Sequence, residues 1–221
     1  MTAHTIDEEV RREPEPAEHF ATIEQESHAT RLGMWVFLAS EVLLFSALLT
    51  LYAYYRLAYP EQFSEGIHAT DKLLGSLNTI VLITSSLAAA LAVWSAEHGK
   101  AKGTVAGLVV TVALALLFLV FKVLEYAEHF REGIWPGGHG RWIEEHGPGG
   151  ANFFNLYYLL TGAHAVHVIA GMTVLTTMGV MFLRKKLRNP AVTIEIGVLY
   201  WHLVDIIWIF LWPLFYLTGH K

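Results

Sequence analysis

The sequence predicts an all-α polytopic membrane protein, a bundle of five transmembrane helices. Apolar residues make up 54% of the 221 residues and charged residues only 16%, whereas soluble domains carry roughly 25% charged residues. The apolar residues fall in five long blocks, and about 20 residues are enough to cross a bilayer. Stretches such as VAGLVVTVALALLFLVF lack the polar stripe, repeated every three or four residues, that a soluble helix bundle needs.

The predicted spans divide the chain into a short tail and one membrane domain. Residues 1–30 are expected to form an acidic, mobile tail, and residues 31–221 the five-helix membrane domain. The fourth block is about 30 residues long, so we expect it to tilt or to extend beyond the bilayer. The predicted spans are 32–55, 73–96, 105–126, 153–183 and 194–217.

The charges that flank the spans predict their orientation, because Lys and Arg are enriched on the cytoplasmic side. Nine basic residues gather on one side and five on the other, which places the N-terminus in the cytoplasm and the C-terminus outside. The first side carries Arg11, Arg12, Arg31, Lys100, Lys102, Arg184, Lys185, Lys186 and Arg188, and the second carries Arg56, Lys72, Arg131, Arg141 and Lys221.

Composition and motifs exclude several classes of function. The chain has no cysteine, which rules out disulfides, thiolate metal ligands and thiol nucleophiles. Its net charge is −5, and it has no basic pattern for nucleic acid. The sequence contains no phosphate-binding loop and no dense histidine cluster. We therefore expect no catalytic residue, no metal site and no redox centre in this chain.

Glu41 is a carboxylic acid in the middle of the first predicted span. It lies ten residues beyond Arg31, which is about 15 Å along a helix. A charge at that depth is costly unless it is paired, and burial favours the neutral form of the acid. We expect Glu41 to be neutral and to bond a polar residue on another helix, with His167 as the first candidate. Its role is either a structural hydrogen bond or the handling of a proton.

Further ionisable residues lie inside the last two predicted spans. His164 and His167 are three residues apart and share a helix face, and His202 and Asp205 repeat that spacing. An Asp at this distance can fix the tautomer and orientation of an imidazole. One interpretation is haem ligation, which needs one histidine from each of two facing helices. The other is hydrogen bonding between helices, which the small residues of the fourth span favour.

Charged residues near the two membrane surfaces have simpler explanations. Lys122 and Glu125 fall in the last turns of the third span, near the outer surface, where a local ion pair with extended, snorkelling side chains accounts for them. Basic residues near the opposite surface are candidates for binding anionic lipid headgroups. These residues are Arg31, Lys100, Lys102, Arg184, Lys185 and Lys186.

Five motifs, taken in order, resemble subunit III of the haem–copper terminal oxidases. They are Ser40–Glu41, LNT at 77–79 with Ser85–Ser86, Glu125–Tyr126, TGAHAVHVIAG at 161–171 and WHLVDIIW at 201–208. The motifs reach all five spans, over about residues 30–217, and the last two are long and specific. The sequence therefore resembles a five-helix bacterial member of the cytochrome c oxidase subunit III family.

The resemblance implies an accessory subunit of a proton-pumping oxygen reductase in aerobic respiratory electron transport, in the bacterial inner (cytoplasmic) membrane. Such a complex is a cytochrome c or quinol oxidase, and its haem and copper belong to partner subunits. Family members pack their helices against subunit I, associate with subunit II and other respiratory subunits, and carry bound phospholipid. They support proton uptake and long-term activity.

The resemblance also implies roles for individual residues. Glu41 matches the carbodiimide-reactive glutamate of the family, a protonated acid in an apolar place. The paired histidines, with His202 and Asp205, then correspond to polar contacts that hold the bundle together. Two features depart from the family. Seven-helix members have two further N-terminal spans that complete a lipid-filled cleft, and Lys122 stands where the family usually has Gln, which leaves a hydrogen-bonding role there open.

Two alternatives remain at this point. One is the related small subunit of a nitric oxide reductase system. The other, of a different class, is a haem b membrane anchor of a quinone-linked dehydrogenase. An anchor needs facing histidines on two spans at matched depths, usually as two pairs, whereas the buried histidines here lie on the last two spans alone.

Overall fold

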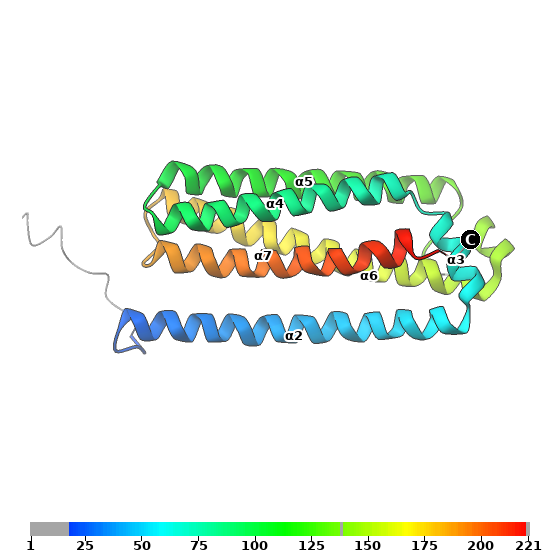
Figure 1. The fold of residues 1–221 in the computed structure, drawn as a ribbon, viewed down its shortest axis with the longest axis horizontal. Helices are drawn as coiled ribbons and strands as arrows, with labels where there is room; N and C mark the ends of the chain where they lie inside the picture. Colours follow the sequence, from blue (N-terminus) through cyan, green and yellow to red (C-terminus); the bar gives the residue numbers. More distant parts are fainter. Residues whose placement is uncertain (1–17, 138, 220–221) are drawn as a thin grey trace, which may run out of the picture.

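The computed structural model describes residues 18–137 and 139–219, which are almost entirely helical (Figure 1). Five helices in this part of the chain are long and apolar enough to cross a membrane, which confirms the predicted bundle. They are α2 (Ile23–Ala58), α4 (Lys72–Glu97), α5 (Ala101–Arg131), α6 (Arg141–Leu183) and α7 (Pro190–Trp212). The short helix α3 (Pro60–His68) joins α2 to α4, and the π-helical turn η1 (Pro213–Leu217) continues α7.

Capping residues set the helix ends, so the helices extend beyond the predicted spans. The Thr22 side chain accepts a hydrogen bond from the backbone N–H of Gln25, and α2 begins at the next residue, Ile23. Residues 23–30 of the expected tail are therefore helical. Residues 1–17, with Arg11 and Arg12, lie outside the described residues, as does Lys221.

Helix α6 is divided by a sharp break. Gly147 has φ 65° and ψ −161°, a backbone conformation that glycine adopts readily and other residues rarely do. Pro148 follows it, at a position where a helix starts well because proline already has helical φ. The break separates a short outer segment, 141–146, from the long helix that forms the fourth span. That long helix begins five residues before the predicted start at residue 153.

Helix α7 occupies the centre of the bundle, where it packs against α4 and α6. In its most apolar window 61% of the residues are buried, against 11% in α2. Trp201 donates its indole N–H to the Ser85 hydroxyl at 3.2 Å, and Trp208 donates to the Thr79 hydroxyl at 3.0 Å. The LNT and SS motifs of the second span therefore supply the partners of Trp201 and Trp208 in the last span.

Helix α2 lies at the edge of the bundle and is attached along one narrow seam (Figure 1). Its buried residues are Leu38, Phe45 and Tyr52, spaced seven residues apart. This spacing is that of a heptad repeat, in which one stripe of a helix faces its neighbours. Glu41 lies three residues after Leu38. If Leu38 is at position a of the heptad, Glu41 is at position d, the second position that faces the neighbouring helices. Most other apolar side chains of α2 are exposed, as expected for a surface in contact with lipid or with another subunit.

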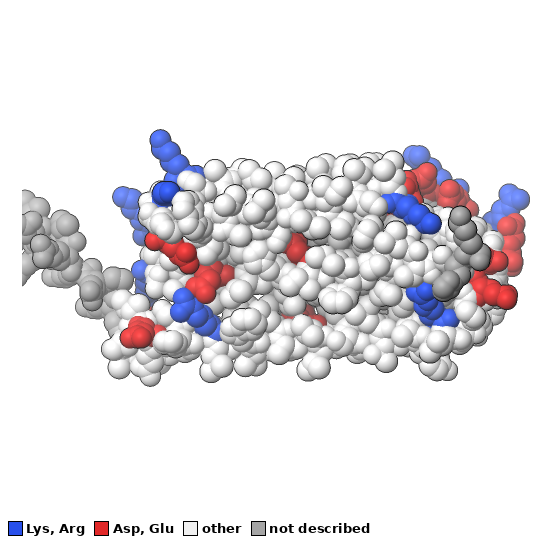
Figure 2. All heavy atoms as spheres, in the orientation of Figure 1, with Lys and Arg blue, Asp and Glu red and all other residues white. Residues whose placement is uncertain are grey.

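Charged side chains gather at the two ends of the bundle. Figure 2 shows Lys, Arg, Asp and Glu gathered at both ends, with a surface between them that is almost entirely of other residues and has only small acidic patches. The described start of α2 and the end of η1 lie at opposite ends (Figure 1). This is the arrangement that an odd number of membrane crossings requires.

Candidate functional site

Glu41 forms the predicted hydrogen bond with His167 of α6. The Oε2 atom of Glu41 lies 2.8 Å from Nε2 of His167, and the two side chains are 16% and 18% exposed. The other ring nitrogen, Nδ1, lies 2.8 Å from the carbonyl oxygen of Ala163. A carbonyl oxygen can only accept, so Nδ1 carries a proton. The predicted contact is confirmed.

The geometry defines the proton content of this pair. One further proton lies between Nε2 of His167 and Oε2 of Glu41. If the acid holds it, both groups are neutral; if the imidazole holds it, the two form an ion pair. In either case the hydrogen bond gives the acid a partner at this depth, which offsets part of the cost of placing it there. That Glu41 itself is neutral stays a prediction.

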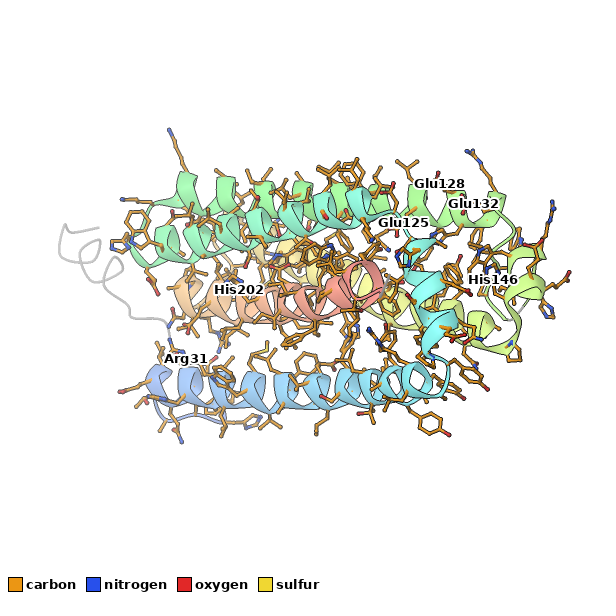
Figure 3. All side chains as sticks on the ribbon, turned by 45° about the vertical axis from the view of Figure 1, so that its right-hand side comes forward. Arg31, Glu125, Glu128, Glu132, His146 and His202 are labelled. Atoms are coloured by element: carbon orange, nitrogen blue, oxygen red, sulfur yellow. The ribbon has the colours of Figure 1, made fainter. Side chains whose placement is uncertain are left out.

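Two further polar contacts hold α2 at its ends. Near one end, Arg31 forms a two-pronged ion pair with Glu195 of α7, with Nη2–Oε2 at 2.7 Å and Nε–Oε1 at 3.3 Å (Figure 3). Near the other end, Tyr52 donates to the carbonyl oxygen of Leu214 at 2.7 Å. Together with Glu41, they fix α2 to α6, α7 and η1 at three depths of the seam.

Arg56 strengthens the outer contact of α2. Its guanidinium donates to the hydroxyl of Thr218 at 2.6 Å and to the carbonyl oxygen of the same residue at 2.8 Å. Sequence reasoning used Arg56 only as a topology charge and did not single out Glu195. The pairing of Glu195 with Arg31 could have been predicted, because Glu195 is an acid at the start of the last span and lies at the same predicted membrane surface as Arg31.

Lys122 and Glu125 form the expected ion pair, but the expectation that their side chains extend to the surface is wrong. The side chains are only 4% and 1% exposed. Lys122 Nζ donates to Glu125 Oε2 at 2.9 Å, and also to the hydroxyls of Tyr157 at 2.9 Å and Tyr216 at 3.0 Å. Both tyrosines donate to Glu125 Oε1, at 2.7 and 2.6 Å. The three protons of the ammonium and both oxygens of the carboxylate are thus engaged.

The burial of this cluster has a clear cause. Helix α5 continues to Arg131, six residues beyond Glu125, so the pair lies well inside the helix (Figure 3). Tyr157 from α6 and Tyr216 from η1 close over it. Neither tyrosine was singled out from the sequence, although both lie at the outer ends of their predicted spans, at the depth of Lys122. At this position the family usually has Gln, and the sequence left open whether Lys122 forms hydrogen bonds there. The structure shows that it does.

The remaining buried polar residues contact different neighbours. His164 is fully buried, and its ring lies 5.5 Å from that of Phe118 and 5.2 Å from that of Trp208, centroid to centroid. Within the described residues neither of its nitrogens has a hydrogen-bond partner. His164 and His167 share a helix face by sequence, but they point to separate helices, α5 and α7 for the first and α2 for the second.

His202 takes its orientation from another helix. Its Nδ1 atom lies 2.7 Å from the hydroxyl of Ser86 on α4. The orientation of His202 by Asp205, which the spacing allowed, does not occur in the structure. The carboxyl of Asp205, which is 4% exposed, interacts with the same serine, but neither of its oxygens reaches hydrogen-bonding geometry. The Ser86 hydroxyl had been noted only as part of the SS motif.

These contacts bear on whether the histidines ligate haem. His167 bonds Glu41, His202 bonds Ser86, and His164 packs between two aromatic rings. His167 and His202 thus hydrogen-bond residues of other helices, as the second interpretation of the sequence predicted, whereas His164 packs against aromatic rings without a hydrogen bond to a described residue. Across residues 18–137 and 139–219 there is no group of three or more His, Cys, Asp or Glu side chains arranged to hold a metal ion.

Comparison with known proteins agrees with these features. The family model described as cytochrome c oxidase subunit III matches residues 13–136 and 147–220. The chain belongs to the cytochrome c oxidase subunit III family. The segment between the two matched ranges contains the outer part of α6 that precedes the break at Gly147. With five helices able to cross a membrane, this family member is a multi-pass membrane protein.

Individual relatives span the chain to different extents. A haem–copper oxidase subunit I+III of Aeropyrum pernix is 31% identical over 195 residues, which are 85% of this chain and 22% of that protein. A quinol oxidase subunit 3 of Bacillus spizizenii is 29% identical over 218 residues, covering 93% of this chain and 98% of the relative. A cytochrome c oxidase subunit 3 of Bacillus sp. strain PS3 is 28% identical over 210 residues, 93% of each chain.

The buried cluster predicts a strong energetic coupling between Lys122 and Glu125. Lys122→Met leaves a buried carboxylate without its counter-ion, which is expected to lower the free energy of unfolding by about 3–5 kcal/mol. Lys122→Met combined with Glu125→Leu removes both charges and is expected to cost less than Lys122→Met alone. Thermal and denaturant unfolding of the purified protein measures both effects.

A matched control is the ion pair of Arg141 and Glu145, whose side chains are 89% and 60% exposed. Arg141→Gln is expected to change stability by less than about 1 kcal/mol. Equal effects of Arg141→Gln and Lys122→Met would contradict the account of the cluster.

Proposed function

We propose that this chain is the accessory subunit III of a proton-pumping haem–copper oxygen reductase. It holds no redox centre, packs directly against the catalytic subunit I, and stabilises that subunit while supporting proton uptake. The family match over both halves of the chain carries the proposal. The relative in which subunits I and III form one polypeptide supports a direct contact with subunit I, because fused domains function side by side.

The long apolar surface of the bundle suits this role. Exposed apolar side chains cover the outer faces of α2, α4 and α5, and polar contacts are concentrated inside. In a membrane, lipid tails are as apolar as such a surface, so packing and inter-helix hydrogen bonds decide association. A bundle held rigid from within offers a fixed surface for a neighbouring subunit.

Glu41 has a structural role in this proposal. It bonds His167, and the two helices that carry them have no other side-chain hydrogen bond to one another among the described residues. Two other acids of the bundle are each paired with a base, Glu195 with Arg31 and Glu125 with Lys122. No succession of carboxylates in the described part of the chain leads from Glu41 to a surface, as a proton relay would need.

Co-purification tests the assignment. The complex isolated from native membranes through a tag on this chain is expected to contain a large haem–copper subunit. The separated chain is expected to hold no stoichiometric haem or copper, which metal analysis and an absorption spectrum measure. A Soret band that stays with the separated chain would instead support a haem b anchor. A partner that reduces nitric oxide would support the other alternative.

The variants of Glu41 test its structural role. Glu41→Gln keeps the shape and a hydrogen bond to His167, so assembly and turnover-linked proton uptake are expected to stay near those of the wild type. Glu41→Leu leaves a buried imidazole without its partner and is expected to lower stability by about 1–3 kcal/mol. Proton uptake that slows several-fold in Glu41→Gln while assembly is intact would show that the acid relays protons.

Infrared difference spectra test the protonation state of Glu41 directly. A carbonyl band of a protonated acid is expected in the wild type and should disappear in Glu41→Gln. If the spectra show only an ionised carboxylate at this position, the proton belongs to His167 and the expectation of a neutral Glu41 is wrong.

The orientation in the membrane is also proposed. The N-terminus lies in the cytoplasm and the C-terminus outside, in a bacterial inner (cytoplasmic) membrane. The excess of Lys and Arg at the end where α2 begins supports this orientation. Reporter fusions at Met1 and Lys221 are expected to report opposite sides. Two termini on the same side would mean that one of the five helices does not cross.

A further inference from the structure

A chain of aromatic side chains leads from the interior of the bundle to the loop between α5 and α6, at the end opposite the start of α2 (Figure 1). Its first member, Trp208 of α7, is fully buried, and its last member, Trp135 of the loop, is 48% exposed. The members between them come from η1, α6 and α5. In order, the chain consists of Trp208, Tyr216, Tyr157, Tyr158, Phe130 and Trp135.

The inner members of this aromatic chain contact one another closely. The ring of Trp208 lies 6.4 Å from that of Tyr216, centroid to centroid, and the hydroxyl oxygens of Tyr216 and Tyr157 are 3.4 Å apart. The rings of Tyr157 and Tyr158 are 5.3 Å apart. These ring separations lie within the range of packed aromatic pairs.

The outer members continue the chain to the surface. The ring of Phe130 lies 5.8 Å from that of Tyr158 on one side and 4.7 Å from that of Trp135 on the other. Phe130 and Trp135 are stacked, with only 5° between their planes. An exposed tryptophan is thereby connected to buried tyrosines through rings in contact.

The chemistry of these side chains makes the aromatic chain a path for electrons. Tyr and Trp are, together with Cys, the side chains that give up a single electron most readily, and this protein has no Cys. The rate of electron transfer falls exponentially with the distance between donor and acceptor, so rings in contact exchange an electron much faster than isolated rings. Phe130 is not easily oxidised itself, but its ring bridges Tyr158 and Trp135.

Glu125 gives the buried tyrosines a proton acceptor (Figure 3). A phenol loses an electron readily only if its proton leaves at the same time, because the oxidised phenol is a very strong acid. Tyr157 and Tyr216 both donate hydrogen bonds to Oε1 of Glu125, at 2.7 and 2.6 Å. Tyr157 thus has both a path for electrons to the surface and an acceptor for its proton.

We propose that Tyr157 is a redox-active tyrosine and that the aromatic chain carries oxidising equivalents between it and Trp135 at the surface. The oxidants that suit this site are one-electron oxidants of high potential. Oxygen reduction generates oxidants of this class, so their source inside the complex rests on the proposed function. The path itself depends only on the contacts among the described residues.

The electrons and protons balance in two steps. In the first, the oxidant takes one electron from Tyr157, the phenolic proton passes along the hydrogen bond to Oε1 of Glu125, and a neutral tyrosyl radical remains. In the second, one electron from Trp135 refills Tyr157 through the rings between them, and the proton returns from Glu125. The indole of Trp135 loses its N–H proton to water, and a soluble reductant such as ascorbate restores it with one electron and one proton.

Photochemical oxidation of the complex isolated from native membranes tests the path in the reverse direction. Ruthenium(III) tris-bipyridine, generated in the aqueous phase by a light flash, oxidises exposed side chains, and samples frozen afterwards are examined by electron paramagnetic resonance. The wild type is expected to give a tyrosyl signal that decays slowly, because Tyr157 is fully buried. The oxidant is supplied from outside, so the outcome does not depend on the oxidase assignment, which co-purification tests separately.

Trp135→Phe removes the exposed end of the path and is expected to lower the yield of the slowly decaying signal several-fold. Trp94→Phe is the matched control, because Trp94 is 46% exposed and its ring contacts His98 and Lys100 rather than a tyrosine. Equal yields in the wild type and Trp135→Phe, or an equal loss in Trp94→Phe, would overturn the proposal.

A second variant tests the buried tyrosine. Tyr157→Phe keeps the ring and removes the phenol, so the slowly decaying signal is expected to fall several-fold as well. Tyr54→Phe, at a position on α2 that is 65% exposed, is its control and is expected to leave this signal unchanged. Thermal unfolding shows whether Tyr157→Phe is folded, and the surface variant Trp135→Phe decides the question if it is not. A slow signal that survives in folded Tyr157→Phe means that the proposal is wrong.

Discussion

The hydrogen bond between Glu41 and His167 is the constraint on which the attachment of α2 depends. This helix buries little of its surface, and its contacts with the rest of the bundle follow one heptad seam. A seam between apolar helices in a membrane gains little from the hydrophobic effect, because lipid would cover the same surface equally well. Polar contacts therefore decide the position of α2 along and around its axis. Glu41 supplies the one at mid-depth, between Arg31 and Tyr52.

Polar contacts between helices also position the remaining four helices. The indole N–H groups of Trp201 and Trp208 join α7 to α4, and the cluster around Lys122 and Glu125 joins α5, α6 and η1. Each contact links elements that are distant in the sequence and satisfies polar groups that could not be left unpaired in hydrocarbon. The bundle is thus held from its interior, and its outer surface is left to lipid and to partner subunits.

Polar contacts inside the bundle and an apolar surface outside explain how a subunit without a redox centre contributes to an oxidase. Two pairs of its ionisable groups lie inside the bundle: Glu41 with His167, and Lys122 with Glu125. Such pairs fix one arrangement of helices at the cost of desolvating their members. In the proposed function, the contribution of the chain is a defined shape beside the catalytic subunit.

The sequence by itself determined the number of spans, their approximate limits and the family, because hydrocarbon thickness sets segment length and because the motifs around His167 and Asp205 are long. It also determined that Glu41 needs a partner at its own depth, which limited the choice to a few residues. The apolar pattern of a span and the depth of a residue in the membrane are properties of single helices, so they can be read directly from the sequence.

Only the tertiary structure decided which side chains meet. The burial of Lys122 depends on Tyr157 and Tyr216, which come from other elements, and the orientation of His202 depends on Ser86 rather than on the Asp205 of its own helix. The rotation of each helix about its axis decides such contacts. That rotation results from packing among all the helices at once, and no single span contains it.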